Sequence, residues 1–125
     1  MTYKNIIYNG KPHYGKHVLH RSEFCNHNLL DKKSICEFII ELCDKIEMVR
    51  FGDPFVERFG NGDELGISAV QLIETSAITI HTNDKERELY LDVFSCKDYS
   101  SEVVVECVKK WFDPKISNQK AIYRE

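Results

Sequence analysis

In the second half of the chain, hydrophobic positions alternate with polar ones, a pattern typical of strands with one covered face. The alternation is clearest over residues 77–82 and 88–94, which a short polar link separates. The apolar positions that share one face are Ile78, Ile80, Leu89, Leu91 and Val93. The opposite face carries Ala77, Thr79, His81, Tyr90, Asp92, Phe94 and Cys96. The two runs therefore predict an antiparallel hairpin.

Two other stretches have the spacing of amphipathic helices, residues 29–46 and residues 100–112. The apolar positions on one face of the first are Leu30, Ile35, Phe38, Ile39, Leu42, Cys43 and Ile46. The second carries Val104, Val105, Val108 and Trp111. It should end before Pro114, because proline disfavours helical backbone in the residue that precedes it.

The remaining segments complete a small α+β domain. Strands are predicted at residues 17–23, 66–74 and 116–123, and weaker strand character extends over residues 48–59. Residues 1–14, with an Asn9-Gly10 turn, read as an arm or a short edge strand, and residues 60–65 as a loop. The predicted architecture is a two-layer sandwich, mainly an antiparallel sheet with two helices on one face. Residues 1–125 are expected to form a single domain.

The second face of such a sheet has no helix to cover it. Its predicted residues include Tyr90 and Phe94, which makes the face too aromatic to be left fully in water. A second copy of the chain packing there is the simplest solution. We therefore expect a homodimer.

Composition excludes several kinds of partner. The net charge of −3 supplies no basic field, so no nucleic-acid partner is expected. No apolar run approaches the ~20 residues of a membrane span, so no membrane partner is expected either. The first residues lack the features of a signal peptide. Five cysteines without regular spacing indicate reduced thiols and a cytoplasmic location.

Ser76, His81 and Cys96 are the candidate chemical groups of the chain. A hydroxyl, an imidazole and a thiol on neighbouring strands can act as nucleophile, base and proton donor. Each residue alone is ordinary, because strand ends often carry turn serines, packing histidines and small buried cysteines. Their value as candidates comes from their occurrence together, and we expect Cys96 to lie near Ser76 and His81 in three dimensions.

This segment also contains a series of short motifs. They are Gly66-Ile67-Ser68, then Ser76, then Ile80-His81-Thr82, then Leu91-Asp92-Val93-Phe94-Ser95-Cys96. With these residues at these spacings, the segment resembles the prokaryotic S-adenosylmethionine decarboxylase proenzymes, which cleave themselves to make a pyruvoyl cofactor. A weaker similarity extends upstream through Gly15-Lys16-His17, Cys25 and Arg58-Phe59.

The resemblance implies a role for each matched residue. Cleavage would fall between Thr75 and Ser76, and Ser76 would become the pyruvoyl group. His81 would be the base of this processing, and Ser68 a hydroxyl that assists it. The ketone would then bind a substrate amine as a Schiff base, and Cys96 would return a proton after decarboxylation. Members of the family work as dimers with shared active sites, which agrees with the expected homodimer.

The sequence departs from the family pattern at the junction and near the substrate. The family has Glu-Ser-His at the cleavage point, where this chain has Thr75-Ser76-Ala77. Phe59 matches the aromatic residue placed on the adenine ring, and Lys85 stands where the family has an acid that binds ribose. Phe59 and Lys85 are therefore the substrate-binding candidates.

Three functions remain open at this point. The first is a pyruvoyl-dependent decarboxylase of S-adenosylmethionine, which serves spermidine biosynthesis. The second is the same cofactor acting on arginine or ornithine. The third is a non-catalytic binding or regulatory paralogue that never cleaves.

A metal site is a weaker hypothesis. Imidazole and thiolate are the usual zinc ligands, and His17, His20, Cys25 and His27 lie within one short segment. Their spacing matches no common zinc signature, so packing roles are preferred and no metal is expected. The glycine-rich residues 60–64 lack the lysine of a phosphate-binding loop.

Overall fold

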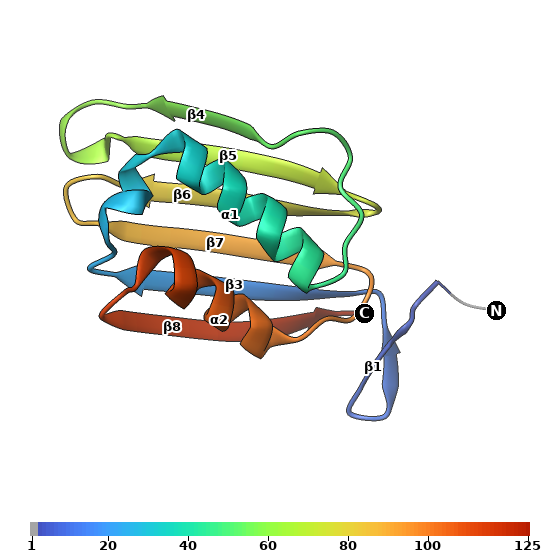
Figure 1. Ribbon diagram of the computed structural model, residues 1–125. Coiled ribbons are helices and arrows are strands. Elements are labelled where there is room, and N and C mark those ends of the chain that lie inside the picture. The colour runs from blue at the N-terminus through green and yellow to red at the C-terminus, as the bar shows by residue number, and fades with distance from the viewer. Residues whose placement is uncertain (1–2) are drawn as a thin grey trace.

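The computed structural model describes residues 3–125 and shows an antiparallel sheet with two helices on one face (Figure 1). Its strands are β3 (Gly15–Glu23), β4 (Phe55–Phe59), β5 (Gly66–Ile73), β6 (Ser76–Asn83), β7 (Glu88–Ser95) and β8 (Ile116–Arg124). The helices are α1 (Lys32–Lys45) and α2 (Ser101–Phe112). In space the strands lie in the order β4-β5-β6-β7-β3-β8. The predicted α+β class and two-layer sandwich are confirmed.

The central hairpins follow from the alternating pattern. Ile80 of β6 lies between Ala69 of β5 and Leu91 of β7. All three are buried on the helix side, because every second residue of a strand points to the same face. The strands β5, β6 and β7 agree with the predicted ranges to within one residue at each end.

The first helix begins later than its apolar spacing predicted. The expected helix covered residues 29–46, whereas α1 begins at Lys32 and His27–Leu30 form a separate 3-10 helix, η1. The boundary lies at Asp31, whose carboxylate accepts a hydrogen bond from the backbone N–H of Ser34 and caps α1. An apolar stripe alone does not reveal this break.

The core lies between the sheet and the two helices. Phe38 of α1 meets Phe112 of α2 edge to face, with ring centroids 5.0 Å apart. Burying a side chain of this kind contributes about 1.5–3 kcal/mol relative to exposure. Other fully buried members of the core are Leu29, Ile35, Ile39, Leu42, Ile67, Ile78, Ile80, Leu89 and Leu91.

The N-terminal segment forms a small hairpin of its own, made of β1 (Ile6–Tyr8) and β2 (Lys11–His13). Both residues of the Asn9-Gly10 turn have positive φ, as a type I′ hairpin turn requires. The Tyr8 ring stacks on Tyr123 of β8 at 4.0 Å between centroids. The expected arm or edge strand is therefore corrected to a separate two-stranded sheet. Residues 1 and 2 lie outside the described part.

The expected strand over residues 48–59 is shorter than predicted. Only β4 is regular, and the segment before it joins the sheet through a single bridge between Arg50 and Ile73. Gly52 in this segment has a φ of +72°, a conformation outside any strand. The regular strand therefore begins only after Pro54.

His20 is a buried polar residue on the helix side of β3. Its Nδ1 lies 2.7 Å from Oε1 of Gln119, and its Nε2 lies 2.7 Å from Oγ of Ser22. The amide oxygen can only accept, so Nδ1 carries the proton and the neutral ring accepts at Nε2. Burial lowers the pKa of His20 below its usual 6.5, and the bond to Gln119 opposes this shift only in part.

This lowered pKa predicts that His20 makes the protein less stable in acid. Below about pH 6.5 the unfolded chain takes up a proton that the folded chain resists, so stability falls as the pH falls through that value. Replacing His20 with Gln should flatten the change in urea midpoint between pH 7.5 and pH 5. His27→Gln, on an exposed side chain, is the control and should leave that change as it is. An unchanged pH dependence in His20→Gln would contradict the assignment.

Candidate active site

Ser76 is the first residue of β6 and follows a tight turn. Ile73 pairs with Ser76 in the β5–β6 hairpin, so only Glu74 and Thr75 form the loop. The Ser76 hydroxyl oxygen accepts a hydrogen bond from the backbone N–H of Cys96 at 3.1 Å. The hydroxyl of the proposed cleavage serine is thus held beside the end of β7, at the right-hand end of the sheet in Figure 1.

Thr75 connects the same residues from the other side. Its hydroxyl donates to the carbonyl oxygen of Glu74 at 2.6 Å and also contacts Sγ of Cys96. Since the single hydroxyl proton is used on Glu74, the Cys96 thiol is the donor in the second contact. Thr75, Ser76 and Cys96 therefore form one connected group, which we call the junction cluster.

A cavity of about 580 Å³ opens beside the junction cluster. Thr75 and Cys96 line it, so the thiol faces a space that a small molecule can enter. Its charged lining residues are Glu47, Glu74, Lys97 and Asp98. Carboxylates outnumber the single lysine, whose Nζ already donates to the carbonyl oxygen of Glu47 at 3.1 Å.

Ser68 and His81 form a second group on the outer face of the sheet. They are paired in the β5–β6 register, and Oγ of Ser68 lies 3.0 Å from Nδ1 of His81. The strands can approach closely here because Gly66 has no side chain. A Cβ at that position would lie 1.8 Å from the carbonyl oxygen of Thr82.

The expectation that Cys96 lies near both Ser76 and His81 holds within one chain for Ser76 and not for His81. Ser76 and His81 lie five positions apart on one strand, which corresponds to about 16 Å at about 3.3 Å per residue. An odd spacing also places them on opposite faces of the sheet. The structure brings Cys96 to Ser76 and Ser68 to His81, and it keeps these two pairs apart.

The two substrate-binding candidates lie at the end of the sheet away from the junction cluster. Phe59 ends β4, is 64% exposed and borders an open depression of about 300 Å³ together with Ser68 and His81. Lys85 lies in the β6–β7 turn, where its Nζ bonds to the carboxylate of Asp63 at 2.8 Å. Phe59 therefore accompanies the Ser68–His81 pair, whereas Lys85 is already paired on the surface.

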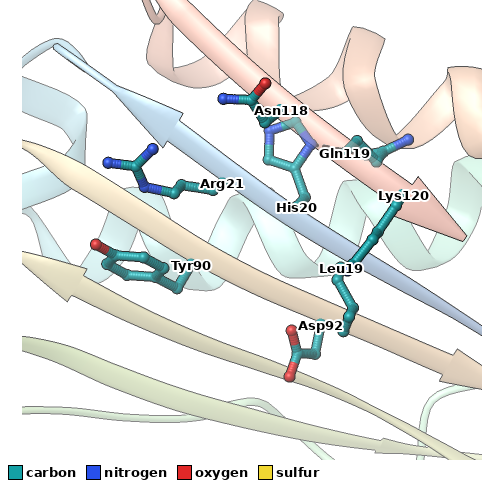
Figure 2. Close-up of a pocket in the computed structure, with 8 residues that line it drawn as sticks. All are labelled: Leu19, His20, Arg21, Tyr90, Asp92, Asn118, Gln119 and Lys120. Carbon is teal, nitrogen blue, oxygen red and sulfur yellow. Dashed lines mark hydrogen bonds between the residues drawn. The ribbon is translucent and has the colours of Figure 1, made fainter.

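A further depression of about 410 Å³ lies on β7, β3 and β8, and Figure 2 shows its lining side chains. One of its charged groups, Arg21, is already partnered within the chain. Arg21 forms ion pairs with Glu23 and Glu88, and the Tyr90 hydroxyl donates to Glu88. None of the predicted catalytic or substrate-binding residues borders this depression.

The histidines and cysteine considered for zinc do not come together. His17 and His20 are three positions apart on β3 and so lie on opposite faces of the sheet. The His17 ring stacks on Phe94 at 4.3 Å, and burial lowers the pKa of His17. Within residues 3–125, no three His, Cys, Asp or Glu side chains are grouped to hold a metal ion.

Sequence reasoning missed the part that Thr75 and the cavity carboxylates play in the geometry of the site. The signal available was the short link between two strands, but a β-branched residue is a poor indicator of a tight turn. The carboxylates come from the ends of different elements, and only the folded chain brings them to one cavity.

A family model for S-adenosylmethionine decarboxylase matches residues 16–125, and the chain belongs to this family. A curated relative from Caldivirga maquilingensis, an arginine decarboxylase proenzyme, is 29% identical over 86 residues. The match covers 69% of this chain and 64% of that protein, so the chain spans less than two thirds of its relative.

A solved structure has the same fold. The crystal structure of the adenosylmethionine decarboxylase from Aquifex aeolicus VF5 matches with a TM-score of 0.75 at 19% sequence identity. The match covers 90% of this chain and 91% of that one. The resemblance described from the motifs is therefore confirmed at the level of family and fold.

Proposed function

We propose that this protein is a pyruvoyl-dependent decarboxylase that forms its cofactor by cleaving itself between Thr75 and Ser76. The observation that carries the proposal is the junction cluster. There, a serine hydroxyl directly follows a turn residue, is oriented by the backbone of Cys96, and lies beside a thiol that lines a cavity. Membership of the S-adenosylmethionine decarboxylase family supports the same reaction class.

Self-cleavage needs only groups of the chain itself and one water molecule. The Ser76 oxygen attacks the Thr75 carbonyl carbon, the C–N bond breaks, and the hydroxyl proton moves to the released amine, which gives an ester. A base removes the Ser76 α-proton, and the Thr75 carboxylate leaves from Cβ. Water then replaces the nitrogen of the dehydroalanine, releasing ammonia and leaving a pyruvoyl group on the shorter downstream fragment.

The residues around Ser76 fit such a group. When formed, the ketone would withdraw the electron pair from the bond to the substrate carboxylate. The Cys96 thiol, already a donor to the Thr75 hydroxyl, lines the cavity where the decarboxylated carbon needs a proton. Cys96 is therefore the proposed proton donor of the decarboxylation.

The separation of the two residue pairs supports a homodimer with shared sites. His81 cannot reach Ser76 of its own chain, so the base that acts on one junction comes from a second copy. The face that carries Ser68 and His81 also exposes large apolar side chains that a partner sheet would cover. These side chains are Phe55, Val70, Leu72, Tyr90 and Ile122.

A substrate with an additional cationic group, with arginine as the first candidate, fits the cavity best. Glu47, Glu74 and Asp98 give the cavity a negative lining, which attracts a guanidinium group. Lys85 stands at the position of the family's ribose-binding acid, and its bond to Asp63 leaves no acid there for a ribose. The relative from Caldivirga maquilingensis is named an arginine decarboxylase proenzyme. S-adenosylmethionine, with Phe59 against its adenine ring, is the second candidate.

Two simpler expectations accompany this proposal. No helix within residues 3–125 is long and apolar enough to cross a membrane. All five cysteines are free, which is typical of proteins kept in a reducing compartment. We therefore retain the cytoplasm as the proposed location.

Cleavage is tested by the intact mass of the purified chain. We expect two fragments, residues 1–75 and a fragment that begins at position 76 and is blocked to Edman sequencing. Ser76→Ala should remain a single chain, because no hydroxyl is left to attack. A wild-type chain that stays intact after long incubation would contradict the enzyme proposal and favour the non-catalytic paralogue.

The shared site is tested by mixing two inactive chains. His81→Ala and Ser76→Ala chains, distinguished by tags, should each remain uncleaved alone. When they are co-expressed, the His81→Ala chain should cleave, because its Ser76 meets the intact His81 of the other copy. Co-expression with a Ser76→Ala/His81→Ala chain is the control and should restore nothing. A His81→Ala chain that cleaves alone at the wild-type rate would contradict the role of His81. A mixture in which this chain stays intact would contradict the shared site.

Release of labelled carbon dioxide tests the substrate and the proton donor. Carboxyl-labelled arginine should release it at least about ten times faster than ornithine or S-adenosylmethionine.

Cys96→Ala should lower turnover about a hundredfold, within the range typical of a lost general acid. It should leave cleavage intact, because the backbone of Cys96 bonds to Ser76. Cys36→Ala on α1 is the control. Preference for S-adenosylmethionine would overturn the arginine assignment, and full turnover in Cys96→Ala would exclude its role.

A further inference from the structure

We propose that Thr75 is a positioning residue for self-cleavage. Its left-handed backbone holds conformational strain directly beside the peptide bond that breaks, and the cleavage reaction releases this strain. The inference rests on the proposed function, because it concerns the same bond. It assigns to Thr75 a part in the reaction that depends on its β-branched shape, independent of any hydrogen bond that its side chain makes.

The backbone of Thr75 has an unfavourable conformation. Its φ is +58°, in the left-handed region, where β-branched residues are outliers. Among the non-glycine residues in residues 3–125 with positive φ, Thr75 is the only β-branched one. The others are Asn9, Phe24, Glu47, Arg87 and Asp113. Asparagine and aspartate tolerate this region, whereas phenylalanine, arginine and glutamate are less favourable there but lack a branch at Cβ.

The surroundings of Thr75 prevent the conformation from relaxing. The loop has two residues, and the pairing of Ile73 with Ser76 closes it on both sides. In such a loop, a positive φ at the second position is normally provided by glycine or asparagine. The strain is thus maintained by the hairpin itself.

The first step of cleavage removes this constraint. When the Thr75 carbonyl moves from the Ser76 nitrogen to the Ser76 oxygen, Cβ and Oγ are inserted between the carbonyl carbon and Cα of Ser76. The connection becomes one bond longer and gains rotation about the Oγ–Cβ and Cβ–Cα bonds, so Thr75 can return to an ordinary φ. A destabilisation present in the reactant and already relieved in the transition state that leads to the ester speeds the shift, because only such differences lower a barrier.

Variants of position 75 separate strain from hydrogen bonding. Thr75→Val keeps the branch and loses the hydroxyl, Thr75→Ser keeps the hydroxyl and loses the branch, and Thr75→Gly loses both. Each full chain is made by cell-free synthesis with labelled methionine, and fragment formation is followed over time. We expect Thr75→Val within about twofold of wild type. Thr75→Gly should be about tenfold slower, equivalent to about 1.4 kcal/mol.

A second measurement reports the strain without cleavage. In the uncleavable Ser76→Ala chain, adding Thr75→Gly should raise the melting temperature by about 3 °C or more, since relief of about one kcal/mol shifts it by several degrees. A residue that merely supported the fold would lose stability on replacement by glycine. Arg87→Gly, at a left-handed position in the neighbouring hairpin, is the matched control and should leave the cleavage rate unchanged.

Three outcomes would overturn the inference about Thr75. The first is that Thr75→Gly cleaves at the wild-type rate. The second is that Thr75→Val cleaves slowly while Thr75→Ser cleaves fast. The third is that Thr75→Gly does not raise the melting temperature of the Ser76→Ala chain. The slow valine and fast serine pattern would assign the effect to the hydroxyl. A wild-type chain that never cleaves is a different result, because it contradicts the proposed function itself.

Discussion

The structure depends on burial of one sheet face under two helices. Six antiparallel strands present their alternate side chains to α1 and α2, and Phe38 and Phe112 join the helices above them. Each buried side chain of this size contributes about 1.5–3 kcal/mol. The need to keep these side chains out of water therefore determines which face of each strand points toward the helices. The positions of the chemical groups follow from this constraint. Residues of one parity support the core, and residues of the other parity are free to meet a partner.

That same constraint explains why the candidate groups of one chain separate into two pairs. His81 cannot turn toward the junction without exposing Ile80 and Ile78, which are fully buried. Ser76 is not buried in the core, because it lies at the end of the strand. There the turn and the backbone N–H of Cys96 fix the position of its hydroxyl. Under the proposed function, a chemistry that needs all these groups would therefore require a second copy of the chain.

Much of the fold could be predicted from the sequence because its signals are local. The alternation of Leu89, Leu91 and Val93 and the helical spacing through Phe38 and Leu42 each need only a short window. The start of α1 was misplaced because Leu30 continues the apolar pattern, whereas the cap at Asp31 ends it. The place of β3 between β7 and β8 could not be predicted, since pairing between distant segments leaves no local pattern.

The site was only partly predictable for a related reason. Family motifs identified Ser68, Ser76, His81 and Cys96, but a motif gives order along the chain and no distance in space. The odd spacing between Ser76 and His81 was visible in the sequence and already implied opposite faces. The left-handed Thr75 was not, because propensity argues against it and only the closed hairpin imposes it.

The strand order also determines what a break after Thr75 would do to the molecule. The first fragment would hold β3, β4, β5 and α1, and the second would hold β6, β7, β8 and α2. In the sheet, β3 of the first fragment lies between β7 and β8 of the second fragment (Figure 1). The two fragments are therefore interleaved. To separate, the fragments would have to break the hydrogen bonds that join β3 to β7 and to β8, and they would have to expose the hydrophobic core that they share. A severed chain of this design therefore behaves mechanically as one body, and the new chain ends gain freedom only at the tip of a single hairpin.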